Sequence, residues 1–212
     1  MSFNGLIKKD MNYWNRKLHI HIGLFLLVFI WLFSFSGLLL NHGSWEISNF
    51  WEKRKETNSI TAVQVPLERN SNKLIKNILS QLSVNGEVDN VKMWTDSIHF
   101  RVSVPGHVRN FRVDLNSGVC NQNDLKFNLA GTIRTLHTFN GVDRNDANSR
   151  PNWWITKIWR LSMDGIAIGL ILLCISSWIM WFKVRQKFVW GLPIFVAGIG
   201  LAVYFVFVLA AW

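Results

Sequence analysis

Three long apolar stretches without a charged side chain constrain this chain more than any other feature of its sequence. They run over residues 20–40, 166–182 and 190–212. A helix crosses the hydrocarbon core of a bilayer with about 17 to 25 apolar residues, and each stretch falls in that range. We therefore predict an α-helical membrane protein with three transmembrane helices, in which the lipid bilayer is the first partner of the chain.

Composition agrees with a membrane protein and argues against a nucleic-acid partner. Half of the 212 residues are hydrophobic, and the 12 tryptophans are typical of side chains that gather at bilayer interfaces. The formal net charge is +10, but the basic residues are scattered through the middle of the chain and at the ends of the apolar stretches. Because they form no dense stripe, a solvated or lipid-facing surface explains them, and we expect no nucleic-acid binding.

The short flanks of the apolar stretches predict the orientation. Residues 1–19 carry four basic side chains and one acid, and residues 183–189 carry three basic side chains and no acid. Short loops rich in Lys and Arg stay in the cytoplasm. The N-terminus is therefore expected in the cytoplasm, and the long polar segment between the first two spans on the other side of the membrane.

That polar segment has the pattern of an α+β domain. Apolar residues at positions 74, 75, 78, 79 and 82 have helical spacing over 70–82. Short alternating stretches predict strands, with Asp96-Ser97, Pro105-Gly106 and Asn116-Ser117-Gly118 as turns between them. The expected strands are 60–67, 88–94, 97–104 and 108–115, and residues 119–120 end the sheet. One helix then covers one face of an antiparallel sheet.

The expected organisation places this domain as an insertion between membrane helices. An amphipathic helix over 125–139 is expected to lie near the membrane. The parts in chain order are a cytoplasmic tail (1–19), a first transmembrane helix (20–42), the extracytoplasmic α+β domain (43–124), an interfacial helix and loop (125–152), a second transmembrane helix (153–182), a cytoplasmic loop (183–189) and a third transmembrane helix (190–212).

Histidines at the membrane boundaries are the candidate cofactor ligands. His21 and His42 stand at opposite ends of the first span, about 31 Å apart along a helix at 1.5 Å per residue. His137 precedes the second span on the same side as His42. Two imidazoles from different segments suit axial ligation of haem b iron, and Arg134 is placed to reach a propionate. The alternative is that each histidine merely forms hydrogen bonds at a helix end.

Other chemistry has weaker signals. The chain has no HExxH, GxSxG or phosphate-binding glycine loop followed by Lys, so no hydrolase is indicated. No second histidine stands at the cytoplasmic ends of the later spans to pair with His21. Asp164 at the outer end of the second span can bind a proton, position a histidine or cap a helix turn, and Arg160 can meet lipid phosphates.

Two motifs in the first span and one set of residues in the second-span region resemble a known family. They are Arg16-Lys17-Leu18-His19-Ile20-His21-Ile22-Gly23, Ser36-Gly37-Leu38-Leu39-Leu40-Asn41-His42, and Leu136-His137 with Asp164 and Ser176-Ser177-Trp178. Together with the α+β segment at 60–120, they resemble the PepSY-associated transmembrane proteins of bacteria. The family commonly has Thr-Gly where this chain has Ser36-Gly37, and this chain lacks the extra spans of larger relatives.

The resemblance implies a bacterial inner-membrane protein with a periplasmic PepSY-like domain. Some larger relatives are haem-containing reductases of iron–siderophore complexes, and others serve periplasmic redox chemistry. The histidines that match are His21, His42 and His137. We therefore expect an electron-transfer component that binds haem b and works with a protein redox partner or as a homo-oligomer. The resemblance also implies a place in a membrane ferric-siderophore reductase or a related oxidoreductase. The alternative is a non-enzymatic PepSY module that binds or regulates a partner protein.

Overall fold

A computed structural model describes residues 3–66, 70–142, 149–182 and 188–210, with side chains from Asn12 in the first helix and from Trp190 to Leu209 in the last. The chain divides into two compact units. One combines Met1–Leu27 with Ala167–Trp212, and the other is Val28–Ile166.

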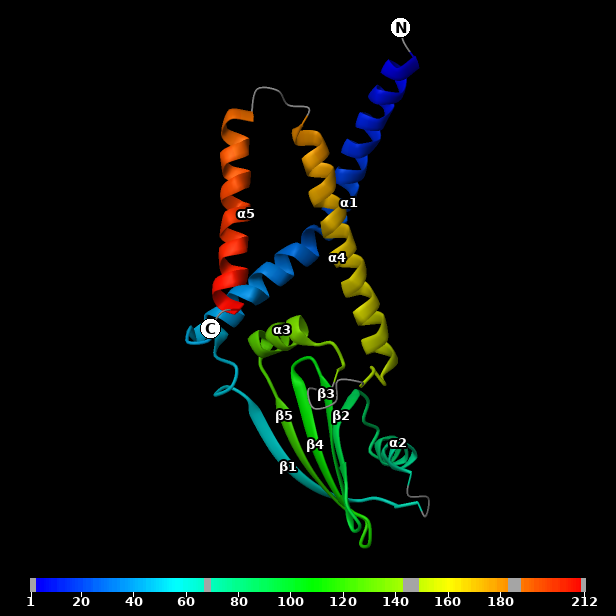
Figure 1. Ribbon diagram of the computed structural model, residues 1–212. Helices are drawn as coiled ribbons and strands as arrows, with labels where there is room; N and C mark the ends of the chain where they lie inside the picture. The colour runs from blue at the N-terminus through cyan, green and yellow to red at the C-terminus, as the bar shows by residue number, and fades with distance from the viewer. Residues whose placement is uncertain (1–2, 67–69, 143–148, 183–187, 211–212) are drawn as a thin grey trace. The chain divides into compact units, whose positions relative to one another are not determined.

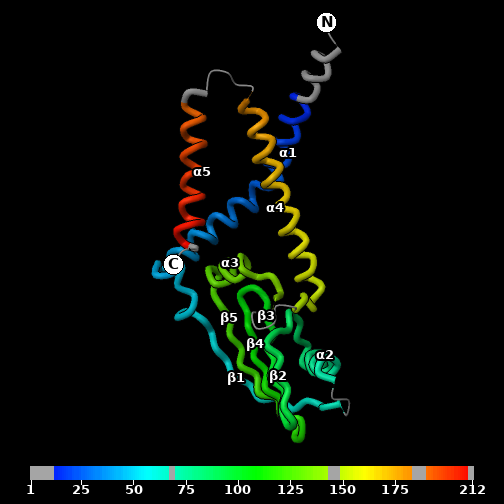
Figure 2. Tube along the Cα trace, in the orientation of Figure 1, coloured from blue at the N-terminus to red at the C-terminus, as the bar shows by residue number. Residues whose placement is uncertain are grey.

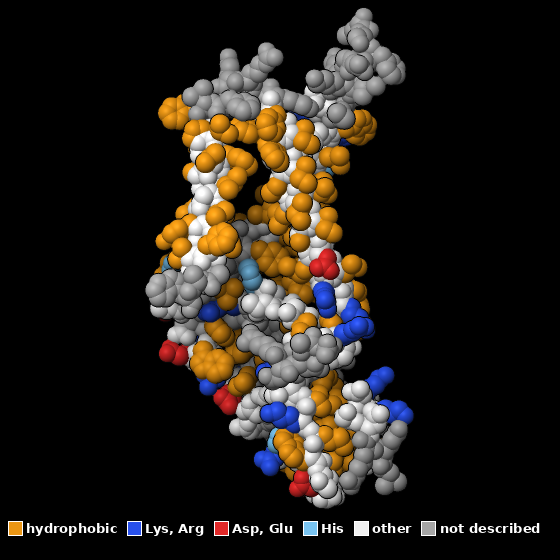
Figure 3. All heavy atoms as spheres, viewed as in Figure 1, with side chains coloured by type: hydrophobic (Ala, Val, Ile, Leu, Met, Phe, Trp, Pro, Cys, Tyr) orange, Lys and Arg blue, Asp and Glu red, His pale blue; other side chains and the backbone are white. Residues whose placement is uncertain are grey.

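Three helices are long and apolar enough to cross a membrane, as the charge-free stretches predict. They are α1 (Phe3–Asn41), α4 (Trp154–Trp181) and α5 (Phe188–Ala210). Their apolar segments, 12–41, 154–181 and 190–209, have mean hydropathies of 2.4, 2.0 and 2.5. Hydrophobic side chains cover long stretches of α4 and α5 in Figure 3. The first helix begins at Phe3, so the residues expected as a tail are helical well before the apolar stretch starts.

In the unit that combines both chain ends, α1 packs closely on α4. A Cβ atom added to Gly169 would lie 2.8 Å from Leu26 Cδ1, which shows how near the two helices come at this glycine. The Asn15 side-chain amide also donates to the Ser176 carbonyl oxygen at 3.1 Å. Small residues permit such close approach between apolar helices, where van der Waals contact holds the pair together.

The second unit contains a five-stranded antiparallel sheet with the order β1-β5-β4-β3-β2 (Figures 1 and 2). We call this sheet, with the helix α2 (Ser71–Gln81), the sheet domain. Its strands are β1 (Lys55–Ala62), β2 (Glu87–Met93), β3 (Ser97–Val104), β4 (His107–Asp114) and β5 (Val119–Lys126). A helix on one face of an antiparallel sheet confirms the expected α+β class.

The core of the sheet domain lies between α2 and one face of the sheet. Asn70 caps the helix by accepting from the backbone N–H groups of Asn72 and Lys73, which would otherwise lack partners. The apolar side of α2 packs against alternate residues of the strands. The buried set is Val63, Leu74, Ile75, Ile78, Val84, Ile98, Phe100, Val102, Phe111, Val113 and Cys120. The helical spacing read from the sequence therefore identified the face that α2 buries.

Two strands differ from expectation. The first was expected at 60–67 and lies at Lys55–Ala62, because it is an edge strand whose residues are all exposed and show no alternation. β5 extends to Lys126 instead of ending near Cys120. It is an interior strand that pairs with β1 on one side and β4 on the other. Its polar sequence gave little strand signal, since only Cys120 is buried in it.

The helix α3 (Leu129–Thr138) follows β5 and packs at the turn between β3 and β4. Asn128 caps its start by accepting from the Gly131 N–H at 2.9 Å. The Thr135 hydroxyl accepts the Gly106 N–H at 2.7 Å. Gly106 has φ of +80°, and a side chain there would run into Thr132, so glycine is required at this turn. The expected helix over 125–139 thus begins at residue 129.

Candidate functional site

The imidazole of His137 is held against the second half of α1. Its Nδ1 lies 2.6 Å from the Ser36 Oγ, and the Ser36 hydroxyl also donates to the Phe33 carbonyl at 3.0 Å. The Phe33 ring meets the His137 ring edge-on, with centroids 5.3 Å apart. Ser36 is buried. One serine near the C-terminal end of α1 therefore connects that helix to the end of α3.

The Ser36–His137 contact is compatible with two placements of one hydrogen. The single hydrogen of the serine hydroxyl can go to the Phe33 carbonyl oxygen or to the His137 Nδ1. When it goes to the carbonyl, the Oγ accepts from Nδ1–H and the lone pair of the neutral ring is on Nε2. A metal-ligating histidine has that tautomer, with its second nitrogen donating to a fixed oxygen.

The His42 ring has its tautomer set by a backbone acceptor. Its Nδ1 lies 3.0 Å from the Leu38 carbonyl oxygen one turn earlier in α1. A carbonyl oxygen only accepts, so Nδ1 carries the hydrogen, and in the neutral ring the lone pair is on Nε2. The ring stacks on Trp45, with centroids 4.1 Å apart and an interplanar angle of 27°. Within the described residues, the His42 and His137 rings each meet their own neighbour and do not contact each other.

His19 and His21, in the first half of α1, make the same two kinds of contact. The His21 Nδ1 lies 2.7 Å from the Lys17 carbonyl oxygen. The His19 Nδ1 lies 2.7 Å from the Ser176 Oγ, which itself donates to the Leu173 carbonyl at 2.9 Å. Ser176 and His19 thus form the same pair that Ser36 and His137 form in the other unit. The sequence singled out His21, whereas the structure gives His19 the interhelical partner.

Arg134 contacts the segment that follows His42, and one of its N–H groups has no hydrogen-bond partner. Its guanidinium lies over the Phe50 ring at 4.6 Å, and its Nη1 donates to the Ser48 carbonyl at 3.3 Å. The Nε of Arg134 is buried and has no hydrogen-bond partner. A buried N–H without an acceptor costs about 1–3 kcal/mol, so an acceptor brought by a ligand would stabilise this side chain.

These residues fit haem in their donor chemistry. Two imidazoles that offer Nε2 are a donor set that could hold a haem iron, and the buried Arg134 Nε suits an acidic group. Phe33, Trp45 and Trp159 supply the aromatic surroundings, and the Trp159 indole is fixed by donation to the Phe139 carbonyl at 3.1 Å. The described residues hold no cluster of three or more His, Cys, Asp or Glu for a metal ion, which a haem with two axial ligands does not need.

A buried carboxylate joins the sheet domain to the start of α4. Glu87, 1% exposed, accepts from the backbone N–H groups of Asn152 at 2.6 Å and Trp153 at 3.1 Å. The Asn152 side-chain amide bonds both backbone groups of Val88, accepting its N–H at 3.0 Å and donating to its carbonyl at 2.7 Å. The edge strand β2 is therefore fastened to the residues that precede α4.

The sheet face opposite α2 is polar. His99 and Arg101 alternate along β3 with the buried Ile98, Phe100 and Val102, so they point away from the core. A depression of about 500 Å³ lies among the strand residues on this face. Burial, followed by the positive charges of Arg112 and Lys92, lowers the pKa of His99. The buried His99 Nε2 has no partner, and its ring lies edge-on to Trp94.

Comparison with protein families decides the identity at the family level. The family described as "Putative PepSY_TM-like" matches residues 13–211. The chain belongs to this family. The PepSY_TM-like match covers the three apolar helices and the sheet domain together, and it confirms the resemblance found in the sequence motifs. Comparison with curated proteins and with solved structures gives no significant match.

Sequence reasoning found the histidines of this PepSY_TM-like chain but missed what holds them. Ser36 stood out in the sequence only as part of the Ser36-Gly37 motif, and it lies 101 residues from His137 in sequence. Ser176 has the same relation to His19 over 157 residues. Glu87 gave no signal, because an acid at the start of a strand is ordinarily exposed. The two Ser–His contacts therefore become visible only in the folded chain, where the helices bring each serine next to its histidine.

Proposed function

We propose that this protein is a membrane electron-transfer component that binds one haem b through His42 and His137 near the non-cytoplasmic face of a bacterial inner membrane. The observation that supports it is how the two rings are held. The Nδ1 of each ring lies within hydrogen-bond distance of a fixed oxygen, the Ser36 Oγ for His137 and the Leu38 carbonyl for His42, so Nε2 is the nitrogen that each ring would offer to iron. The bound haem would supply one-electron transfer, and iron acquisition or periplasmic redox chemistry is the proposed setting.

Each chain residue has a defined part in this proposal. Ser36 and the Leu38 carbonyl orient the two imidazoles and strengthen them as ligands, as oxygen acceptors on the second nitrogen do. Arg134 offers its buried Nε to a propionate. Trp45 and Phe33 contact the His42 and His137 rings and would lie beside the porphyrin, where an apolar surrounding changes the iron potential. His21 is assigned to a second haem only if another subunit supplies the other ligand.

Absorption spectra of the full chain, purified after expression with ample haem, test the proposal. Oxidised and dithionite-reduced samples should show a Soret band and low-spin reduced bands. His42→Ala and His137→Ala should each abolish the low-spin spectrum, because each removes one axial ligand. His99→Ala and His107→Ala, on the sheet, are the controls and should retain it. A full reduced-haem spectrum in the double variant His42→Ala/His137→Ala would show that the ligand assignment is wrong.

A second candidate function is a membrane-anchored module that binds a partner protein. The observation that favours it is the edge strand β1, whose residues are all exposed and whose pairing with β5 occupies one side only. An extended segment of a partner could add to this edge by main-chain hydrogen bonds. Absence of any Soret band in the wild-type protein would reject the first candidate and leave this one.

A further inference from the structure

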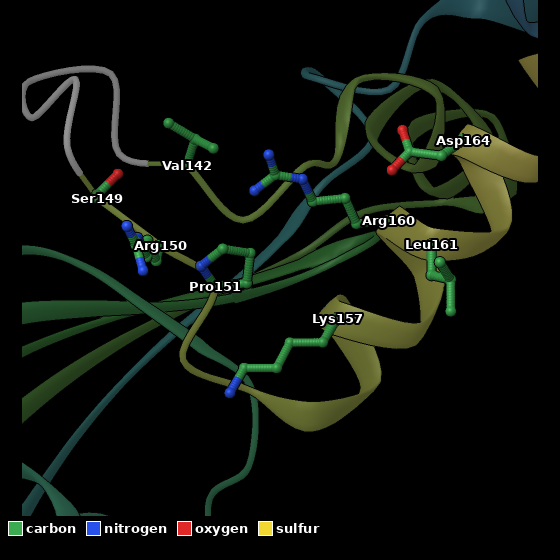
Figure 4. Close-up of a pocket in the computed structure, with 8 residues that line it drawn as sticks. All are labelled: Val142, Ser149, Arg150, Pro151, Lys157, Arg160, Leu161 and Asp164. Atoms are coloured by element: carbon green, nitrogen blue, oxygen red, sulfur yellow. The ribbon is translucent and has the colours of Figure 1, made fainter.

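A cavity lined by basic side chains lies beside the first turns of α4. It has a volume of about 700 Å³ and lies between α4 and the segment that precedes it (Figure 4). Its walls are Val142, Ser149, Arg150, Pro151, Lys157, Arg160, Leu161 and Asp164. All of these residues belong to the unit Val28–Ile166, and none takes part in the histidine arrangement above.

The lining of this cavity has an excess of positive charge. Arg150 comes from the segment before α4, while Lys157 and Arg160 are one helical turn apart on α4 itself. Figure 4 shows the side chains of Lys157 and Arg160 extending from α4 on the side where Arg150 lies, and Asp164 is the one acid among the described residues of the lining. In the described part of the chain none of the three cations forms an ion pair. Their charge is therefore available to an anion.

The length of α4 places these cations at the level of lipid headgroups. The helix has 28 residues, which span about 42 Å at 1.5 Å per residue. A hydrocarbon core is about 30 Å thick, so about eight residues extend beyond it. The charge-free part is 166–182, so the extension is at the N-terminal end, where Lys157 and Arg160 lie. Trp154 lies on the same extension and is 64% exposed, as expected for a tryptophan at the membrane interface.

We propose that this cavity binds the headgroup of an anionic glycerophospholipid. Lys157, Arg160 and Arg150 would hold the phosphodiester. The apolar walls, Pro151 and Leu161 among them, suit the glycerol and the first methylenes of the acyl chains, which a free phosphate lacks. Figure 3 shows basic side chains gathered over this end of α4, next to the apolar surface that lipid covers. This proposal is independent of haem.

Native mass spectrometry of the full chain in an uncharged detergent tests it. The probes are phosphatidylglycerol, phosphatidylcholine with the same acyl chains, and inorganic phosphate. The wild type should retain phosphatidylglycerol in preference to phosphatidylcholine. The double variant Lys157→Gln/Arg160→Gln should bind phosphatidylglycerol about 25-fold more weakly, since each basic residue near a bilayer contributes about fivefold. Binding of phosphatidylcholine should not change.

Two further variants keep the test decisive. Lys92→Gln/Arg112→Gln removes the same charge from the sheet domain and should stay within about twofold of the wild type. Lys157→Arg/Arg160→Lys retains both charges and should keep most of the affinity. The proposal is overturned if the wild type binds both lipids equally, or if the sheet-domain variant loses as much as the cavity variant. Inorganic phosphate that binds as tightly as the lipid would assign the cavity to a soluble anion instead.

Discussion

The Nδ1 of His137 and the Oγ of Ser36 lie 2.6 Å apart, and this contact joins α3 to α1 across 101 residues of sequence. Ser36→Ala removes the hydrogen-bond partner of the His137 Nδ1 and leaves that partly buried ring nitrogen unpaired, at a cost of about 1–3 kcal/mol. We expect the thermal midpoint of the full chain in detergent to fall by about 2–10 °C, measured by circular dichroism. Ser34→Ala, two residues earlier on an exposed position, is the matched control. An unchanged midpoint in Ser36→Ala would contradict the inferred hydrogen bond.

The basic flanks predict that the N-terminus is cytoplasmic and that the sheet domain is not. Cysteine labelling checks this after Cys120 and Cys174 are replaced, with single probes at Ser2 and Asn85. Ser2 lies outside the described residues, and Asn85 lies between α2 and β2. An impermeant reagent applied from the periplasmic side should label position 85 and not position 2. Labelling at position 2 alone would reverse the orientation.

Glu87 should be among the most sensitive side chains of the sheet domain. Glu87→Ala leaves the backbone N–H groups of Asn152 and Trp153 without an acceptor in a buried place. The expected loss is about 2–5 kcal/mol in the free energy of unfolding, followed by chemical denaturation. Glu46→Ala, an exposed acid whose ion pair with Lys53 has an N–O distance of 3.6 Å, should cost less than about 0.5 kcal/mol. Equal effects of the two changes would show that the buried carboxylate does not hold the segment.

His99 should titrate below its ordinary pKa of 6.5, because burial, Arg112 and Lys92 all disfavour its charged form. A histidine with a lowered folded-state pKa takes up fewer protons folded than unfolded. Its contribution to stability is therefore lost as pH falls below 6.5, and stability rises with pH through that window. NMR titration of the His99 ring should show its pKa rise in Arg112→Gln. Lys55→Gln, on the edge strand β1, should leave it unchanged, and a pKa that ignores Arg112 would refute the assigned cause.

Physical signals that act locally were readable from the sequence. The charge-free stretches predicted three apolar helices because a bilayer requires length and apolar composition in one continuous segment. The spacing of Leu74, Ile75 and Ile78 predicted α2 because a helix brings residues three and four apart onto one face. The strand 97–104 alternates strictly and was placed without error.

Signals that depend on tertiary neighbours were not readable. The position of β1 could not be fixed because an edge strand with both faces exposed has no alternation. β5 is an interior strand only because it returns to pair with β1, the first strand of the sheet. Among the candidate ligands, His42 could be placed because its acceptor, Leu38, lies one turn away. The acceptor for His137 comes from another helix, so only the fold reveals it.

The two edges of the sheet are unequal. At β2 the pairing with β3 is irregular between Asp89 and Lys92, and Asn152 already occupies the backbone groups of Val88. At β1 the strand is regular and exposed. Two copies that met edge to edge would therefore have to join β1 to β1 about a twofold axis, and the resulting ten-stranded sheet would end in two blocked strands. The irregular β2 edges, where Asn152 occupies the backbone groups of Val88, would disfavour growth of such a sheet beyond a dimer.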